Sequence, residues 1–130
     1  MNRVFYFSIA AIIFIGCGKK EEPMEPLYPE TEVSAAESQI SAGKELFEGA
    51  GNCFACHKPD QKIIGPSLHE IAKIYKGKNG DMVAFLKEKA DPIVDPGQYS
   101  VMKTNFAITK NMSDAELESI EAYIYSHLQE

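Results

Sequence analysis

Two cysteines and a histidine lie within five residues, in the segment Cys53-Phe54-Ala55-Cys56-His57, and no other feature of this 130-residue chain constrains its fold as strongly. A cysteine pair at this spacing serves three different chemistries. It can form a redox dithiol, supply half of a structural zinc site, or attach a haem covalently, with the histidine as axial ligand. Each of these chemistries requires different structure around it.

The first two chemistries lack the parts that they need. A thioredoxin-like dithiol lies beside a βαβ unit, and no segment here has convincing strand alternation. A structural zinc site takes four ligands, and the remaining histidines are only His69 and His127, with no second cysteine pair. Haem attachment uses all three motif residues, because two thioethers fix the ring and His57 binds the iron. The motif therefore favours one haem c linked through Cys53 and Cys56, with a structural disulfide between them as the main alternative.

Apolar residues recur with a helical period along the rest of the chain, which predicts an all-α fold. The expected helices cover about 38–49, a stretch from Pro66 to just before Gly77, a short stretch around Met82 that ends before Pro92, and a last stretch that begins at Ser113. Ser113 and Glu116 have the spacing of a capping box. The segment between Pro96 and Asn111 is expected to be irregular. Such short helices bury little surface by themselves, so we expect a large apolar group to complete the core.

The first residues have the composition of an export signal. Arg3 precedes the apolar run Val4 to Ile15, whose twelve residues are fewer than the roughly 20 that span a bilayer. Gly16-Cys17 then resembles the lipobox of bacterial lipoproteins, which implies a signal peptide over residues 1–16 and acylation of Cys17. An ordinary secretory signal is the alternative. Acylation would also remove the odd third thiol from an oxidising compartment.

Residues 17–37 are expected to be a lipidated N-terminus and a mobile tether. Within them, residues 18–37 hold three prolines, two lysines and six glutamates, with little apolar material. The folded part, residues 38–130, carries ten basic and thirteen acidic groups, a net charge of −3. Nucleic acid is not expected as a partner, because proteins that bind it present a basic face.

Residues 38–130 resemble the class I c-type cytochromes. The resemblance is carried by Gly43 and Phe47, the motif at 53–57, Gly65-Pro66-Ser67-Leu68, a methionine in a late loop, and Ala122-Tyr123-Ile124. It implies a cytochrome c-like fold of three to four short helices around one covalently attached haem. It also implies a close crossing of the first and last helices, with Gly43 near Tyr123.

The position of Met102 between the third and last helices is that of the family's second axial ligand. We therefore expect the haem iron to be held by His57 and Met102. The other methionines and histidines that could bind the iron are expected to have different roles. Met82 and Met112 are expected to pack in the core, and His69 and His127 to lie on the surface. His69 is the main competing ligand.

The resemblance also implies contacts around the ligands. The carbonyl of Pro66 is expected to hold the His57 ring, Asn105 to help orient Met102, and Tyr99 to reach a haem propionate. Three lysines flank the motif and Met102 and would suit a basic rim, but solvated surface side chains are the preferred explanation for them: Lys58, Lys62 and Lys103.

These residues together predict an electron carrier and not an enzyme. The carrier would act either alone or as a subunit of a larger oxidoreductase. Iron with two protein ligands leaves no position for a substrate, and His/Met ligation suits a respiratory carrier. The expected partners are a membrane-bound electron donor and a terminal acceptor, such as a quinol-oxidising complex and a haem–copper oxidase or another reductase. The protein is expected to be exported and lipid-anchored to a bacterial membrane, on the periplasmic or outer side.

Two alternatives remain open at this point. One is a haem-based sensor or enzyme subunit whose sixth ligand can be displaced. The other is a periplasmic module without haem, stapled by a disulfide.

Overall fold

The structure is a computed structural model that describes residues 34–128. The expected signal peptide, Cys17 and most of the expected tether lie outside the described residues. Within the described residues the chain is helical and has no β-strand, only an isolated bridge between His57 and Lys62. The predicted all-α fold is therefore confirmed. None of these helices is long and apolar enough to cross a membrane.

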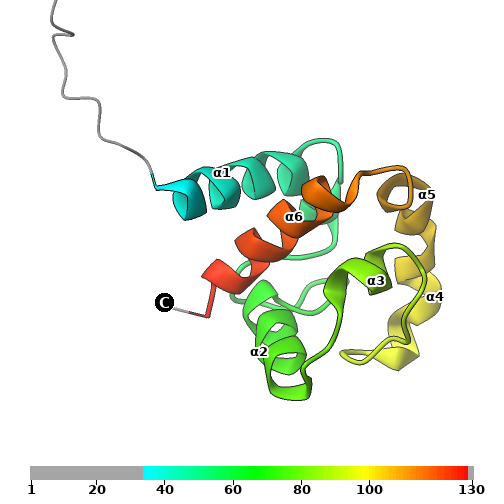
Figure 1. The fold of residues 1–130 in the computed structure, drawn as a ribbon. Helices are drawn as coiled ribbons and strands as arrows, with labels where there is room; N and C mark the ends of the chain where they lie inside the picture. The colour runs from blue at the N-terminus through cyan, green and yellow to red at the C-terminus, as the bar shows by residue number, and fades with distance from the viewer. Residues whose placement is uncertain (1–33, 129–130) are drawn as a thin grey trace, which may run out of the picture. The chain divides into compact units, whose positions relative to one another are not determined.

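Six α-helices and three short 3-10 helices follow one another in this part of the chain (Figure 1). The α-helices are α1 (Ala35–Glu48), α2 (Leu68–Lys78), α3 (Met82–Leu86), α4 (Tyr99–Met102), α5 (Phe106–Thr109) and α6 (Asp114–Ser126). The 3-10 helices are η1 (Cys53–Ala55), η2 (Pro96–Gln98) and η3 (Lys103–Asn105). Helix α6 packs against α1, α2 and α3, so it is the central element of the fold.

Helix α1 begins three residues before the expected start at 38. The Ser34 side chain accepts a hydrogen bond from the Glu37 amide, and the Glu37 carboxylate accepts one from the Ser34 amide at 2.9 Å. This capping box satisfies the first amides of the helix, which have no partner within the helix itself. Its sequence signal, Ser-Ala-Ala-Glu, lies in the segment that was expected to be tether.

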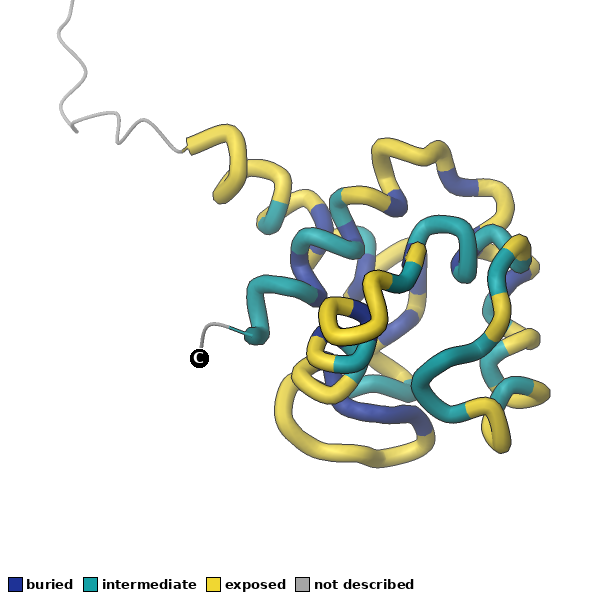
Figure 2. Tube along the Cα trace, turned by 60° about the horizontal axis from the view of Figure 1, so that its bottom comes forward, coloured by how far each residue is buried: buried dark blue, intermediate teal, exposed yellow. Residues whose placement is uncertain are grey.

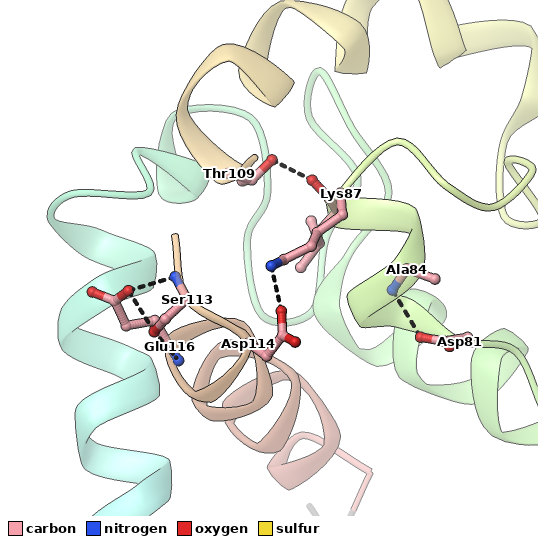
Figure 3. A network of polar contacts seen from close by, with 8 residues as sticks. Asp81, Ala84, Lys87, Thr109, Ser113, Asp114 and Glu116 are labelled. Carbon is pink, nitrogen blue, oxygen red and sulfur yellow. Dashed lines mark hydrogen bonds and ion pairs between the residues drawn. The ribbon is translucent and has the colours of Figure 1, made fainter. Parts of the chain in front are cut away.

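Helices α2 and α3 lie where the sequence predicts them, with one difference at the end of α2. Ser67 caps α2, and Asp81 caps α3 by accepting from the Ala84 amide at 2.8 Å (Figure 3). Gly77 does not follow α2 but lies inside it. The helix ends at Lys78 and is capped by Asn79, whose φ of 49° is the left-handed conformation common at helix ends and accessible to asparagine.

The expectation of an irregular segment between Pro96 and Asn111 is wrong, because residues 96–109 form the consecutive helical turns η2, α4, η3 and α5. Tyr99, Met102, Phe106 and Thr109 follow one another at spacings of three and four, which is a helical stripe. The rings of Tyr99 and Phe106 both pack against Phe85, at centroid distances of 6.3 and 5.4 Å. Tertiary packing of this stripe keeps the segment helical despite its short turns.

The start of α6 is as predicted. The Ser113 and Glu116 side chains form a capping box (Figure 3). An ion pair between Lys87 and Asp114 joins the end of α3 to α6. The buried Thr109 hydroxyl donates to the Leu86 carbonyl at 2.6 Å, which joins α5 to α3.

Helices α1 and α6 cross at close range, as the resemblance implied. A Cβ added to Gly43 would overlap the backbone carbonyl of Ser119 and lie 2.9 Å from the Cβ of Tyr123. One turn further along α1, the rings of Phe47 and Tyr123 meet edge to face, 5.4 Å apart. Figure 2 shows burial beginning only toward the C-terminal half of α1, where this crossing lies. The expected proximity of Gly43 and Tyr123 is therefore confirmed.

Gly43 and Gly77 provide a matched test of this crossing, because each lies inside a helix but only Gly43 faces another backbone. Gly43→Ala should destabilise the protein by about 1–3 kcal/mol or more, since the two helices must separate. Gly77→Ala, with nothing within 4 Å of its added methyl, should stabilise the protein by about 0.5–1 kcal/mol. Denaturant unfolding of both variants measures the difference, and effects of the same sign would contradict the crossing.

Candidate haem-binding site

The cysteine–histidine motif lies on a tight turn directly after α1. The Gly51 amide donates to the Leu46 carbonyl at 2.7 Å, and Asn52 takes a left-handed φ of 50°. The chain reverses here into η1, and the amides of Cys56 and His57 both donate to the Cys53 carbonyl, at 3.1 and 3.0 Å. This single turn places both cysteines and the histidine along one cavity.

The imidazole of His57 is held by the carbonyl of Pro66. Its Nδ1 lies 2.7 Å from the Pro66 oxygen, and because a carbonyl can only accept, Nδ1 must carry the proton. Burial lowers the pKa of His57, although the Pro66 carbonyl acts in the opposite direction. Burial thus favours the neutral ring, in which Nε2 carries the lone pair. That is the protonation state that a metal-binding histidine requires.

Gly65 leaves the space that the His57 ring occupies. A Cβ at this position would overlap Cε1 of the ring and lie 2.8 Å from Nδ1 and 3.0 Å from Nε2. The Gly65 amide also donates to the Cys56 carbonyl at 2.8 Å, which ties the turn before α2 to the motif. The His57 ring can therefore take this position only because residue 65 has no side chain.

The motif faces a large apolar cavity. Its volume is about 200 Å³, counted as space open to the centre of a water molecule, far above the roughly 10–15 Å³ that one water needs. All seven residues predicted to contact a haem within residues 34–128 line it: Cys53, Cys56, His57, Pro66, Tyr99, Met102 and Asn105. Much of the remaining wall is apolar, from α2, α3 and α6, and includes Tyr75, Leu86, Ile120 and Ile124. Two thiols, a neutral imidazole and a thioether around one apolar space fit a haem c.

The other ligand candidates have different surroundings. Met82 also borders the cavity but is 1% exposed and belongs to the buried core, which agrees with its assignment to packing. Met112 is in the same core cluster. His69 is exposed and is not part of the cavity lining; its Nδ1 lies 3.1 Å from the carbonyl of His127. The expectation of a solvated His127 is wrong, because the residue is half-buried and its ring lies 5.0 Å from that of Tyr123.

Asn105 and Tyr99, whose predicted roles toward Met102 and a haem propionate stay predictions, also make contacts within the protein. Asn105 donates through Nδ2 to the Gly51 carbonyl at 3.1 Å, so it joins the end of η3 to the turn before the motif. Tyr99 borders the cavity and packs against Phe85 and Phe106. Sequence reasoning had no signal for the Asn105 contact, because its partner is a backbone group that lies far away in the chain.

The three lysines of the expected basic rim have local partners. Lys62 pairs with Asp95 at 2.8 Å and Lys103 with Glu88 at 3.2 Å. The ammonium of Lys58 lies 5.4 Å from the ring centroid of Phe54. Two of the three charges are thus compensated by a carboxylate, and a free basic rim is not formed by these residues.

The alternatives without haem receive no support from residues 34–128. Cys53 and Cys56 are free thiols and not a disulfide, and burial raises the pKa of the Cys53 thiol to about 11. Within the same residues no cluster of three or more histidine, cysteine or acidic side chains could hold a metal ion.

The sequence pattern of the cytochrome c family matches residues 40–127, which includes the whole site. The chain therefore belongs to the cytochrome c family. This membership implies a covalently bound haem c with its iron, and it supports electron transfer by that haem. It also supports the predicted class I c-type cytochrome.

Individual relatives agree with the family match. Cytochrome c-551 of Azotobacter vinelandii is 31% identical over 87 residues, which are 65% of this chain and 96% of that protein. Cytochrome c-551 of Pseudomonas denitrificans is 48% identical over 46 residues, which are 35% of this chain and 54% of the relative. Cytochrome c2 of Rubrivivax gelatinosus is 56% identical over 36 residues, 28% and 41% of the two chains. The chain thus spans only about half of the last two relatives.

Gly65 offers a test of how the imidazole is positioned. Gly65→Ala should displace the His57 ring and lengthen its hydrogen bond to Pro66, which should destabilise the haem-loaded protein by about 1–3 kcal/mol and change its reduction potential. Gly97→Ala is the control, because its added methyl would lie 3.5 Å from the nearest atom, an ordinary contact. Potentiometric titration and denaturant unfolding measure both effects. Equal results for the two variants would show that Gly65 does not position the ring.

Proposed function

We propose that this protein is a single-haem c-type cytochrome, anchored to a bacterial membrane by a lipid on Cys17, that carries electrons between respiratory complexes. The observation that carries the proposal is the shared cavity of Cys53, Cys56, His57 and Met102. Two thiols for covalent attachment and two axial groups of different chemistry are the complete protein contribution to a His/Met-ligated haem c.

The residues around the cavity have separate roles. Cys53 and Cys56 would hold the ring covalently, His57 would bind through Nε2, and Met102 through its thioether. When bound, the haem supplies an iron that changes its charge by one electron. A thioether ligand and an apolar wall both favour the less charged, reduced site, so they raise the reduction potential.

The rim of the cavity suggests where partners dock. Ile64 and Val101 border the cavity but remain 53% and 44% exposed, so apolar side chains surround its opening to solvent. A membrane-bound donor, such as a quinol-oxidising complex, and a terminal acceptor, such as a haem–copper oxidase or another reductase, would exchange electrons there. Burial of a few exposed apolar side chains favours brief contacts, as a carrier with two partners needs.

The N-terminal segment fits the same function. A lipid on Cys17 would hold the carrier at the membrane of its partners, on the periplasmic or outer side. The proline-rich, acidic segment after it would let the haem domain reach both partners while their effective concentration stays high. The several acyl chains of a bacterial lipoprotein anchor more firmly than one chain does.

The ligand assignment predicts the effect of Met102→Ala. The ferric variant should lose the charge-transfer absorption band between methionine and iron, and its reduction potential should fall, because a thioether stabilises the reduced iron. Absorption spectra and a redox titration of the purified holoprotein measure both changes.

Met82→Leu is the control for this experiment, since it conserves volume in the buried core while removing a thioether. It should retain the band, and so should His69→Gln. Loss of the band in either control would contradict the assignment of Met102. Rapid and complete binding of carbon monoxide to the reduced, unmodified protein would contradict the carrier function and favour a sensor or enzyme with a displaceable ligand.

The membrane anchor predicts the effect of Cys17→Ser. The variant should move from the membrane fraction to the soluble exported fraction, with its haem spectrum unchanged, because the change removes the acylation site and leaves the cavity intact. Detergent-phase partitioning and the mass of the mature N-terminus measure this. A soluble protein with an intact Cys17 would instead indicate an ordinary secretory signal.

A further inference from the structure

Glu88 adopts a backbone conformation that glutamate rarely takes. Its φ is 57°, in the left-handed region that favours glycine and asparagine, and its amide donates to the Phe85 carbonyl at 2.9 Å directly after α3 ends. A strained residue of this kind persists where surrounding contacts hold it, and such contacts point to a role for the side chain. The contacts of the Glu88 carboxylate are therefore informative.

The Glu88 carboxylate binds two lysines that flank one short stretch of chain. Its Oε1 lies 3.2 Å from the ammonium of Lys103, and its Oε2 lies 2.8 Å from that of Lys110. Lys103 follows Met102 directly, and Lys110 follows the last residue of α5. One carboxylate thus joins the end of α3 to both ends of the stretch from η3 through α5.

The segment that carries Met102 needs contacts of this kind. We define the methionine segment as residues 99–105, which comprise α4 and η3. Neither helix has a side-chain cap, and helices this short are not stable by themselves. On the motif side, Asn105 ties the segment to the Gly51 carbonyl. On the α3 side, Lys103 ties it to Glu88, and the Lys103 ammonium also lies 5.4 Å from the ring centroid of Tyr99.

We propose that Glu88 is a positioning residue that holds the methionine segment at the cavity, directly through Lys103 and indirectly through Lys110, which fixes the end of α5 that follows the segment. The inference rests on the proposed function, since it takes Met102 as the haem ligand. Single exposed ion pairs contribute little to stability, but here one carboxylate serves two lysines, and its side chain is only 26% exposed. Glu88 acts on the ligand bond through the segment, without contact to the haem.

The experiment measures how easily Met102 leaves the iron in the ferric holoprotein. Imidazole is titrated against the unmodified protein, Glu88→Gln and Glu88→Gly, and the Met-to-iron band reports displacement. Glu88→Gln removes only the charge of the carboxylate. Glu88→Gly removes the whole side chain and also relieves the strain of the left-handed backbone. Comparison of the two variants therefore separates the effect of the carboxylate from that of the backbone conformation. Asp91→Asn is the matched control, an exposed acid three positions further along that loses the same charge.

We expect both Glu88 variants to bind imidazole about three- to tenfold more tightly, because two weakened ion pairs make displacement of the segment easier. Asp91→Asn should match the unmodified protein. Hydrogen exchange should become faster in residues 96–109 of the Glu88 variants, while α1 and α6 keep their protection.

Two results would overturn the inference. One is imidazole affinity in both Glu88 variants equal to that of Asp91→Asn. The other is a loss of protection spread evenly over all helices, which would mean general stabilisation and not positioning. Absence of the Met-to-iron band in the unmodified protein would instead refute Met102 ligation, and with it the proposed function, before any substitution at Glu88 is considered.

Discussion

The hydrogen bond between Nδ1 of His57 and the Pro66 carbonyl is the interaction on which the site depends. It fixes Nδ1 as the ring nitrogen that carries the proton and leaves Nε2 for the metal. The same stretch of chain is tied to the start of α2 by backbone bonds, from the Leu68 amide to the Lys58 carbonyl at 2.9 Å and from the His69 amide to the Pro59 carbonyl at 3.1 Å. The position of α2 and the orientation of the imidazole are thus set together.

The cavity explains why so small a helical fold needs a group that its sequence does not encode. Core residues on α2, α3 and α6 border it, among them Tyr75, Met82, Leu86, Ile120 and Ile124. These side chains complete their packing only when an apolar group lies between them. A ligand that binds only the folded state stabilises that state, so attachment of the haem and stability of the fold are coupled.

The sequence predicted those parts of the structure that depend on local pattern or on a compact motif. Apolar period located α2, α3 and α6, and the spacing of Cys53, Cys56 and His57 located the centre of the site. It missed the helical turns over 96–109, because Pro96 and Gly97 directly before the apolar stripe indicate a loop, and packing on Phe85 decides the outcome.

Long-range polar contacts were the other part that local pattern could not predict. The bond from Asn105 to the Gly51 carbonyl joins residues that lie 54 positions apart, and no spacing rule connects them. The end of α2 shows the same limit on a smaller scale. Gly77 is a common end signal, but Asn79 two residues later can take the left-handed conformation as well, and the longer helix keeps two more residues hydrogen-bonded.

The two sides of the cavity are held by contacts of different strength. On the side of His57, the imidazole bond is part-buried, and two covalent links are expected next to it. On the side of Met102, the supports are partly exposed, and the helices are four and three residues long. Segments with few buried contacts and solvent-exposed polar bonds open at lower free energy than the core. We therefore expect opening on the methionine side to precede global unfolding, so Met102, the proposed second axial ligand, is more open than His57 to adjustment by surface residues.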